Sequence, residues 1–339
     1  MKRPFVFYPA IDYQSLYQRP QHIASRLVKR GHDVYFRNVG QVGGREPIII
    51  DGVNIYQDWD RRPLEIDDKS IYIVNYPSFM GFRNWDDSTF VIYDCVDDFP
   101  DFEPYQKQAC ESANLILHTT SGIKDDIDKL INDEKKEYFK LPNGCDSMFF
   151  DNTIVAKQMK DLKVKYEKVL LFSGAMYFSW VDVEMMYNIA RHNPKWAVVI
   201  IGDTYTWDFN VTNAPNNILR FGRKEYSELY TYYNGADIGL IPFLDNQISQ
   251  GADPIKLYEY SACGIPVISK NLSFSTNIPE PICYNYNTTE ECISQINKAF
   301  LENNADSVSK RKDFAFENTW ENRVDQLLIK LSTLTELEM

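Results

Sequence analysis

Lys256 and Glu259 are the residues of this sequence whose types and spacing best suit chemistry. They lie three residues apart in DPIKLYEYSACGIPVISK (253–270), a stretch that is otherwise mostly apolar. At that spacing two side chains share one face of a helix. One interpretation is an ion pair on a solvated edge of the helix. The other is a ligand site at the helix N-terminus, where unpaired N–H groups and the helix dipole favour a phosphate group.

The flanking residues predict where this helix begins and ends. We expect Asp253 to be the N-cap and Pro254 the first helical residue, because proline has a helical φ and lacks only an N–H group that would be unpaired there. Gly264 ends the predicted helix. The apolar residues 265–269 then predict a buried strand.

Length and composition limit the class of protein. A chain of 339 residues is long for one hydrophobic core and suits two domains. The net charge of −12 is spread over both halves without a basic arm, so we expect no nucleic-acid partner. The six cysteines lie far apart without a CxxC pair, which predicts a reduced, cytoplasmic protein. No stretch approaches about 18 apolar residues, so we expect a soluble chain for which contact with a membrane surface stays open.

Strand-like and helix-like segments alternate along the chain in two series, separated by the polar residues 151–166. Such alternation, with continuous apolar strands, predicts two parallel sheets covered by helices on both faces. The first series of strands is 4–10, 34–36, 70–76, 90–96, 115–120 and 138–142. The second series is 168–174, 196–202, 217–222, 237–243 and 265–269.

This layout favours the ligand-site interpretation of the charged helix. In α/β folds of this kind a ligand binds beyond the carboxyl ends of the strands, and the helix follows strand 237–243 after a short loop. Gly251 and Ala252 in that loop are small and let backbone N–H groups approach a ligand. Lys256 would then be the counter-charge of a phosphate, and Glu259 would accept hydrogen bonds from ribose hydroxyls.

The run DPIKLYEYSACGIPV (253–267) resembles the signature helix of GT-B glycosyltransferases. The resemblance is to the retaining family 4, in particular to the subgroup that acts in bacterial surface polysaccharide and teichuronic acid synthesis. Other stretches are similar in the same order over nearly the whole chain. They are YQRPQHIASRLVKRGHDV (17–34), VIYDCVDDF (91–99), LPNGCD (141–146), FSGAMYFSWVDVEMM (172–186), FGRKEYSELYTYYNGADIGLIPF (221–243) and FENTWENRVDQLL (316–328).

The resemblance implies a fold and a reaction. The fold is GT-B, with two Rossmann-like α/β domains that face each other across a cleft. Residues 1–150 would bind the acceptor, residues 151–316 would bind the nucleotide sugar, and residues 317–339 would be a helix that returns to the first domain. The enzyme would move a hexose from a UDP- or GDP-sugar to a hydroxyl of a glycan or lipid-linked acceptor, with retention, in cell-surface polysaccharide synthesis. It would act in the cytoplasm or at the inner face of the membrane, without a cofactor.

Carried over to this sequence, the family's donor-binding residues fall on named positions. The second glutamate of the E-x7-E motif is Glu259, which the resemblance implies binds the donor ribose. The first glutamate falls on Gly251, which is a departure from the family pattern. Arg223 and Lys256 are the available cations for the diphosphate, and Gly174 allows close approach. For Arg223 the alternative is an ordinary surface arginine at a strand end.

Asp94, Asp97 and Asp98 are the candidate catalytic residues, because they follow a buried strand of the first half. Three neighbouring carboxylates repel one another, so at least one should have a raised pKa and could accept a proton from a sugar hydroxyl. The alternatives are an N-cap for the next helix and a solvated acidic loop. A metal-binding DxD motif is a further alternative, but the spacing here is DxxDD, so we expect no metal.

Arg19, His22 and His118 are weaker candidates on the acceptor side. Arg19 and His22 lie at the start of the first helix, and His118 ends a strand, where a structural histidine is the alternative. Two other functions stay open for the whole chain. One is a nucleotide-sugar 2-epimerase, which shares the two-domain plan, and the other is a non-catalytic paralogue that binds nucleotide sugar, which the glycine at position 251 would suit.

Overall fold

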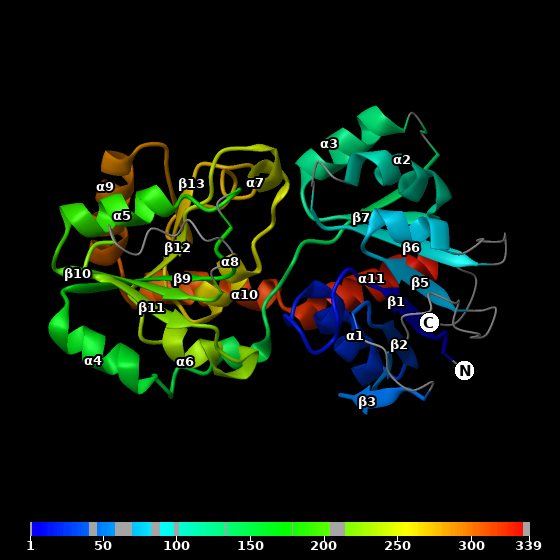
Figure 1. Cartoon of the computed structure of the whole chain (residues 1–339), viewed down its shortest axis with the longest axis horizontal. Helices are drawn as coiled ribbons and strands as arrows, with labels where there is room; N and C mark the ends of the chain where they lie inside the picture. Colours follow the sequence, from blue (N-terminus) through cyan, green and yellow to red (C-terminus); the bar gives the residue numbers. More distant parts are fainter. Residues whose placement is uncertain are drawn as a thin grey trace. The chain divides into compact units, whose positions relative to one another are not determined.

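The computed structural model divides the chain into two compact units (Figure 1). The residues that it describes are 2–40, 46–57, 70–82, 89–97, 102–131, 133, 135–177, 179–203 and 214–334. Unit 1 contains Met1–Asn143, Gly251–Asp253 and Trp320–Met339, and unit 2 contains Gly144–Gln250 and Pro254–Thr319.

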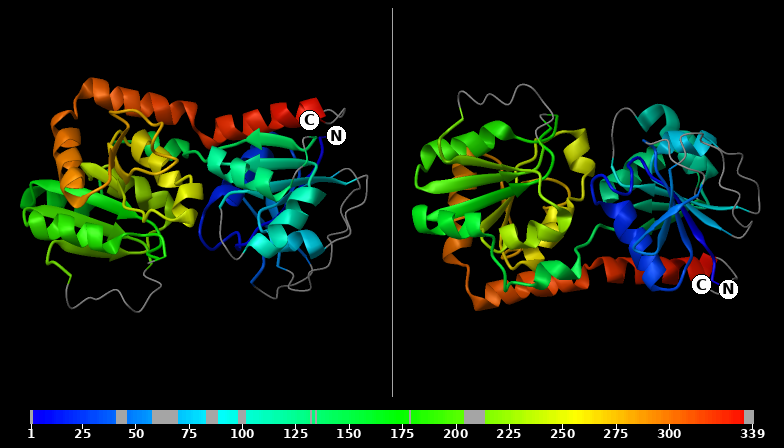
Figure 2. Two further views of the ribbon diagram at one scale, coloured as in Figure 1. Left: turned by 90° about the horizontal axis from the view of Figure 1, so that it is seen from above. Right: turned by 60° about the horizontal axis from the view of Figure 1, so that its bottom comes forward.

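Within the described residues, unit 1 has an eight-stranded sheet with the order β3-β4-β2-β1-β5-β6-β7-β8. The strands are β1 (Phe5–Tyr8), β2 (Val34–Arg37), β3 (Ile48–Ile50), β4 (Val53–Tyr56), β5 (Ile71–Val74), β6 (Phe90–Cys95), β7 (Leu115–His118) and β8 (Glu137–Lys140). All neighbours are parallel except β3 and β4, a hairpin pair that the sequence did not predict. Helices cover both faces (Figure 2). They are α1 (Arg19–Lys29) and α11 (Trp320–Leu334) on one face, and α2 (Glu103–Ser112) and α3 (Ser121–Leu130) on the other, where η1 (Pro77–Phe82) contacts α2.

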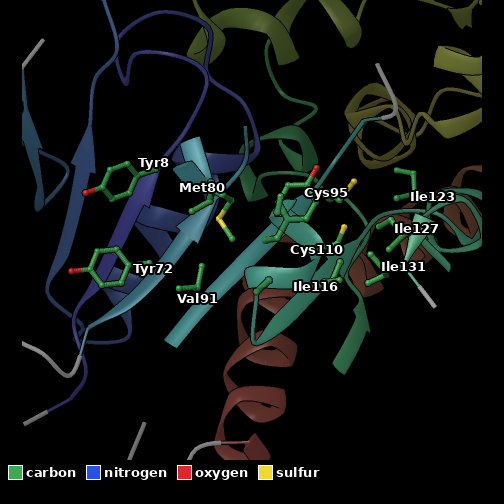
Figure 3. Close-up of a cluster of buried hydrophobic side chains, with 14 of the residues drawn as sticks. Tyr8, Tyr72, Met80, Val91, Cys95, Cys110, Ile116, Ile123, Ile127 and Ile131 are labelled. Carbon is green, nitrogen blue, oxygen red and sulfur yellow. The ribbon is translucent and has the colours of Figure 1, made fainter. Parts of the chain in front are cut away.

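The second of these faces carries a hydrophobic core cluster of unit 1. Tyr8 and Tyr72 lie side by side on neighbouring strands, because alternate residues of a strand point to the same face of the sheet (Figure 3). Ile123 and Ile127 on α3, with Ile131 just after it, recur every four residues and form one apolar stripe toward the sheet. The alternating strand pattern and the helical pattern thus meet in one core.

Helix α11 returns to unit 1 and packs on α1, as the family resemblance implies. The His22 ring stacks on the Trp320 indole with ring centroids 4.6 Å apart. The Arg26 guanidinium pairs with Glu321 at 3.0 Å. The last helix therefore completes the cover of the first sheet.

Within the described residues, unit 2 has a six-stranded, all-parallel sheet with the order β11-β10-β9-β12-β13-β14. The strands are β9 (Lys168–Ser173), β10 (Trp196–Ile201), β11 (Ile218–Gly222), β12 (Ile238–Ile241), β13 (Val267–Lys270) and β14 (Cys283–Tyr286). The helices of the two faces are α5 (Val183–His192) and α9 (Thr289–Leu301) on one, and α4 (Lys157–Lys165), α6 (Leu229–Tyr233) and α8 (Ile255–Ala262) on the other. This is the doubly wound order, in which the direction of winding changes between β9 and β12.

The predicted α/β class, with two parallel, helix-covered sheets, is confirmed. The predicted end of the charged helix is also confirmed, because Gly264 follows α8 with a φ of 78°. The predicted start is wrong by one residue. Pro254 is the N-cap of α8, with φ −67° and ψ 120°. The Asp253 carboxylate instead accepts a hydrogen bond of 2.6 Å from the backbone N–H of Asn143, so a contact distant in sequence takes the place of the local cap.

Candidate functional site

The carboxyl ends of β9 and β12 in unit 2 are the place where a doubly wound sheet binds a ligand. Gly174 directly follows β9 with a φ of 146°, a backbone conformation that favours glycine. A Cβ atom at this position would lie 3.3 Å from Nζ of Lys256 on α8. The turn after β9 and the lysine of α8 are therefore in direct proximity, as expected for Gly174 and Lys256 if both face one ligand.

Lys256 is half-buried among apolar rings. Its ammonium group lies 6.0 Å from the ring centre of Phe172 and 5.7 Å from that of Phe243, and both rings can stabilise a cation. Burial lowers the pKa of Lys256, and the nearby Glu259 carboxylate opposes that change. The result is a cation with little solvent around it, which would interact strongly with an anionic ligand.

Glu259 is buried, with only 4% of its surface exposed. The Tyr233 hydroxyl donates to Oε2 of Glu259 at 3.2 Å and lies 2.7 Å from the Ser173 hydroxyl. Burial raises the pKa of Glu259 to about 7, while Lys256 and the hydroxyls of Tyr233 and Tyr226 partly oppose the rise. Glu259 therefore changes charge close to neutral pH.

The donor-binding role of Gly251, Ala252 and Arg223 stays a prediction. Gly251 and Ala252 belong to unit 1, where the Thr120 hydroxyl donates to the Gly251 carbonyl at 3.4 Å. Arg223 directly follows β11, and its guanidinium lies 3.9 Å from the carboxylate of Asp203 at an exposed position. Within unit 2 the structure thus brings together Gly174, Lys256 and Glu259.

Asp94 lies inside unit 1 and is fully buried at the end of β6. The Arg19 guanidinium donates to both carboxylate oxygens, with Nε–Oδ2 and Nη2–Oδ1 distances of 2.8 Å. The Asn75 amide donates a further bond of 2.7 Å to Oδ2. Arg19 also donates to Oδ1 of Asn143 at 3.1 Å. These contacts favour a structural role for Arg19 and Asp94, and their predicted acceptor-side and catalytic roles stay predictions.

Asp97 is only partly buried and lies close to other charges of unit 1. Burial raises its pKa to about 6; Arg19 opposes the rise, and Asp253 and Asp94 add to it. This agrees with the expectation that one carboxyl of the DxxDD group has a raised pKa. Asp98 lies outside the described residues.

The histidines of unit 1 are buried and hold fixed positions. His22 is stacked between α1 and α11 against Trp320. His118 has a ring nitrogen 2.9 Å from the Thr120 carbonyl, and burial lowers its pKa. Their predicted acceptor-side role stays a prediction, and their burial favours a structural one.

Sequence reasoning missed several polar residues around these sites. The Tyr233 hydroxyl contacts Glu259, and the Ser173 hydroxyl contacts Tyr233. Asn75 contacts Asp94, and Asn143 contacts Arg19. No local signal marks them, since their partners lie 19 to 124 residues away in sequence. Only the position of Ser173 at the end of a predicted strand could have indicated a ligand-facing residue.

The described residues contain neither a candidate metal site nor a candidate membrane span. No group of three or more His, Cys, Asp or Glu side chains among them could hold a metal ion. In the same part of the chain, no helix combines the length and apolar character required to cross a bilayer. The expectation that the protein uses no metal and no cofactor stays a prediction.

Residues 167–298 match the family model described as glycosyl transferases group 1. The chain is also 24% identical over 230 residues to TuaH of Bacillus subtilis, whose name assigns it to teichuronic acid biosynthesis as a glycosyltransferase. That alignment covers 62% of this chain and 57% of TuaH, so the chain spans little more than half the length of this relative.

Solved structures resemble the chain over nearly its whole length. Sucrose-phosphate synthase from Thermosynechococcus elongatus has a TM-score of 0.75 and 12% identity, and the match covers 98% of this chain and 100% of the other. Anabaena HepE, solved with UDP and glucose, has a TM-score of 0.71 and 11% identity with the same coverage. These likenesses show the fold, which is GT-B with two Rossmann-like α/β domains. The resemblance to GT-B glycosyltransferases is confirmed.

Replacing Arg19 by alanine should lower the free energy of unfolding of unit 1 by about 3–5 kcal/mol, because the change leaves the buried Asp94 carboxylate without its partner. Arg30→Ala is the matched control. Arg30 is the C-cap of α1, but it pairs with Asp325 at the surface, and such pairs contribute about 0–1 kcal/mol. Equilibrium urea denaturation measures both variants. Similar losses in the two would contradict the structural role of the Arg19–Asp94 pair.

Glu259→Gln should raise the stability of the ligand-free protein at pH 8 but not at pH 4. The pKa of about 7 in the folded state is above the unfolded value of 4.5, so the native carboxyl holds its proton more tightly. Wild-type stability therefore falls as pH rises from about 4.5 to 7, and the neutral glutamine avoids a loss on the order of 3 kcal/mol. Thermal melts at both pH values measure the difference. A variant that is less stable than wild type at pH 8 would contradict this assignment.

Proposed function

We propose that this protein is a glycosyltransferase that moves a sugar from a nucleoside diphosphate sugar to a hydroxyl of an acceptor. The observation that supports it most is the convergence of Gly174, Lys256 and Glu259 at the strand switch point of unit 2. All three lie within residues 167–298, the part that matches the group 1 family. A small turn, a cation and a buried carboxylate suit a diphosphate joined to a ribose.

The diphosphate would lie against the turn at Gly174 and the first turn of α8. The first N–H groups of a helix have no partners inside the helix, and the helix dipole favours negative charge there. Lys256 adds a full positive charge in an environment of low polarity. As the bond to the sugar breaks, the diphosphate gains negative charge, and groups already in place to meet that charge lower the barrier.

The ribose would lie at Glu259. An ionised carboxylate accepts hydrogen bonds from both ribose hydroxyls, whereas a protonated one loses part of this capacity. Because the pKa of Glu259 is about 7, donor binding should weaken as pH falls below 7. The complex of HepE with UDP and glucose supports a uridine donor for this chain, with a GDP-sugar as the other candidate.

The acceptor would lie on unit 1, at the carboxyl edge of its sheet. Asp97 is the carboxyl best suited to accept the acceptor's proton, since its pKa of about 6 places it near neutral pH. The match to TuaH supports a glycan or lipid-linked acceptor of cell-surface polysaccharide synthesis. We further propose hexosyl transfer with retention, without a metal, at the cytoplasmic face of the membrane. The six free, buried cysteines suit that compartment.

Turnover of the donor tests the proposal directly. Lys256→Ala should lower kcat for sugar release from UDP- or GDP-sugars by about 10²–10³, the typical effect of losing one group that stabilises developing charge. Glu259→Ala should mainly weaken donor binding, by about tenfold or more. Released UDP or GDP is measured with and without mixed glycan acceptors. Lys195→Ala is the control, because Lys195 is an exposed lysine of the same unit paired with Glu167.

Two results would contradict the proposal. Wild-type protein that binds nucleotide but turns over no donor on any acceptor would indicate the non-catalytic paralogue, which Gly251 in place of a carboxylate suits. Full activity in both site variants, with their folding intact, would place the donor elsewhere.

A further inference from the structure

Two hydroxyl groups, those of Tyr233 and Ser173, link Glu259 to the end of β9. The Tyr233 hydroxyl on α6 lies 3.2 Å from Oε2 of Glu259 and 2.7 Å from Oγ of Ser173, the last residue of β9. Tyr233 is 1% exposed and Ser173 is 6% exposed, so water has little access to either. One hydroxyl hydrogen can be donated to only one acceptor at a time, so an ionised Glu259 would accept the hydrogen bond of Tyr233 while the Ser173 hydroxyl donates to the Tyr233 oxygen.

Ser173, at the other end of this hydrogen-bonded series, is itself held in place on the sheet. The backbone N–H of Ser173 donates to the Tyr260 hydroxyl at 3.0 Å, and that hydroxyl donates to the Leu171 carbonyl at 3.4 Å. The rings of Tyr233 and Tyr260 also pack with centroids 4.9 Å apart. Tyr233 therefore has one fixed position, set by two hydrogen-bond partners and by packing.

The carboxyl end of β9 also carries the turn that lies against Lys256. Ser173 is followed by Gly174, whose turn lies against the Lys256 ammonium. Glu259 and Lys256 are on one helix. The contact of Lys256 with the Gly174 turn joins α8 to the end of β9, and the hydrogen bonds from Glu259 through Tyr233 to Ser173 join them a second time. The position of the carboxylate and the position of the turn are thus linked.

We propose that Tyr233 is a positioning residue that holds Glu259 to receive ribose hydroxyls, and that Ser173 holds Tyr233 in turn. The inference rests on the proposed function, because it takes the ligand to be a ribonucleoside diphosphate. A glutamate side chain that is free to rotate would lose conformational entropy on binding, whereas one fixed by Tyr233 has already lost it. Tyr233 therefore contributes to the preference for a nucleotide that has both ribose hydroxyls.

The charge of Glu259 gives this role a pH signature. The groups around the carboxyl are Lys256 on the same helix, Tyr233 on α6, Tyr226 on the preceding turn and Asp146 before η3 (Ser147–Phe150). Lys256 and the two hydroxyls favour the ionised form, and Asp146 disfavours it. Removing the Tyr233 hydroxyl takes away a donor to the charged form, so the pKa of Glu259 should rise in the variant.

The test compares UDP with 2′,3′-dideoxy-UDP by isothermal titration calorimetry between pH 5.5 and 8.5, with GDP in parallel. For Tyr233→Phe, we expect UDP to bind about tenfold more weakly, and the dideoxy compound to bind as it does to wild type. The midpoint of the pH dependence of UDP binding should move upward by about one unit. Ser173→Ala should change both quantities in the same direction and by less. Tyr232→Phe, on the same helix, is the control and should change neither.

The outcomes separate the inference from the function on which it rests. Wild-type protein that binds neither UDP nor GDP overturns the proposed function and the inference with it. Wild-type preference for UDP that is lost in Glu259→Gln but kept in Tyr233→Phe, with an unchanged pH midpoint, overturns the inference alone. Equal weakening of UDP and 2′,3′-dideoxy-UDP in Tyr233→Phe indicates a structural role for the hydroxyl, not one toward the ribose, and also overturns the inference. Unchanged binding of the dideoxy compound shows that the variant is folded.

Discussion

The structure of unit 2 depends on the burial of one carboxyl group, Glu259, beside the end of a parallel strand. A carboxylate with 4% exposure is costly unless hydrogen bonds and a cation compensate for the lost water. The Tyr233 hydroxyl and the Lys256 ammonium provide part of that compensation, from α6 and from α8 itself, and the pKa of Glu259 still rises to about 7. These two helices and strand β9 must therefore meet at one place, which fixes the geometry of the ligand edge.

The strand order explains why α6, α8 and β9 meet at the carboxyl end of β9. In the order β11-β10-β9-β12-β13-β14, connections leave β9 and β12 toward opposite sides, so their carboxyl ends are not covered by one connection. Close approach of neighbouring turns is required as well. A Cβ atom at Gly202, after β10, would overlap the carbonyl oxygen of Gly174, so only glycine lets these two strand ends pack together. The small residues keep the backbone near the place where a phosphate would lie.

The sequence predicted the features that arise from local patterns, and missed those that arise from contacts distant in sequence. Alternating apolar segments predicted both sheets, and the spacing of Lys256 and Glu259 predicted one helix face. Tyr233 was not predicted, because it reaches Ser173 from 60 residues away and nothing in its own segment indicates this. The prediction that Asp253 is the N-cap of α8 is wrong for the same reason, since a partner 110 residues away in sequence binds its carboxylate.

Asp94, near the end of β6, and Glu259, on α8 beside the end of β9, are both buried carboxyl groups, yet their capacity for a ligand differs. A carboxylate has about four acceptor positions. From described residues, Asp94 receives two N–H groups of Arg19, one of them shared between both oxygens, and the Asn75 amide, so most of these positions are taken. Glu259 receives its bonds from tyrosine hydroxyls, and burial raises its pKa to about 7. A ligand that brings hydroxyl groups therefore relieves the cost of the Glu259 charge, whereas it adds little at Asp94.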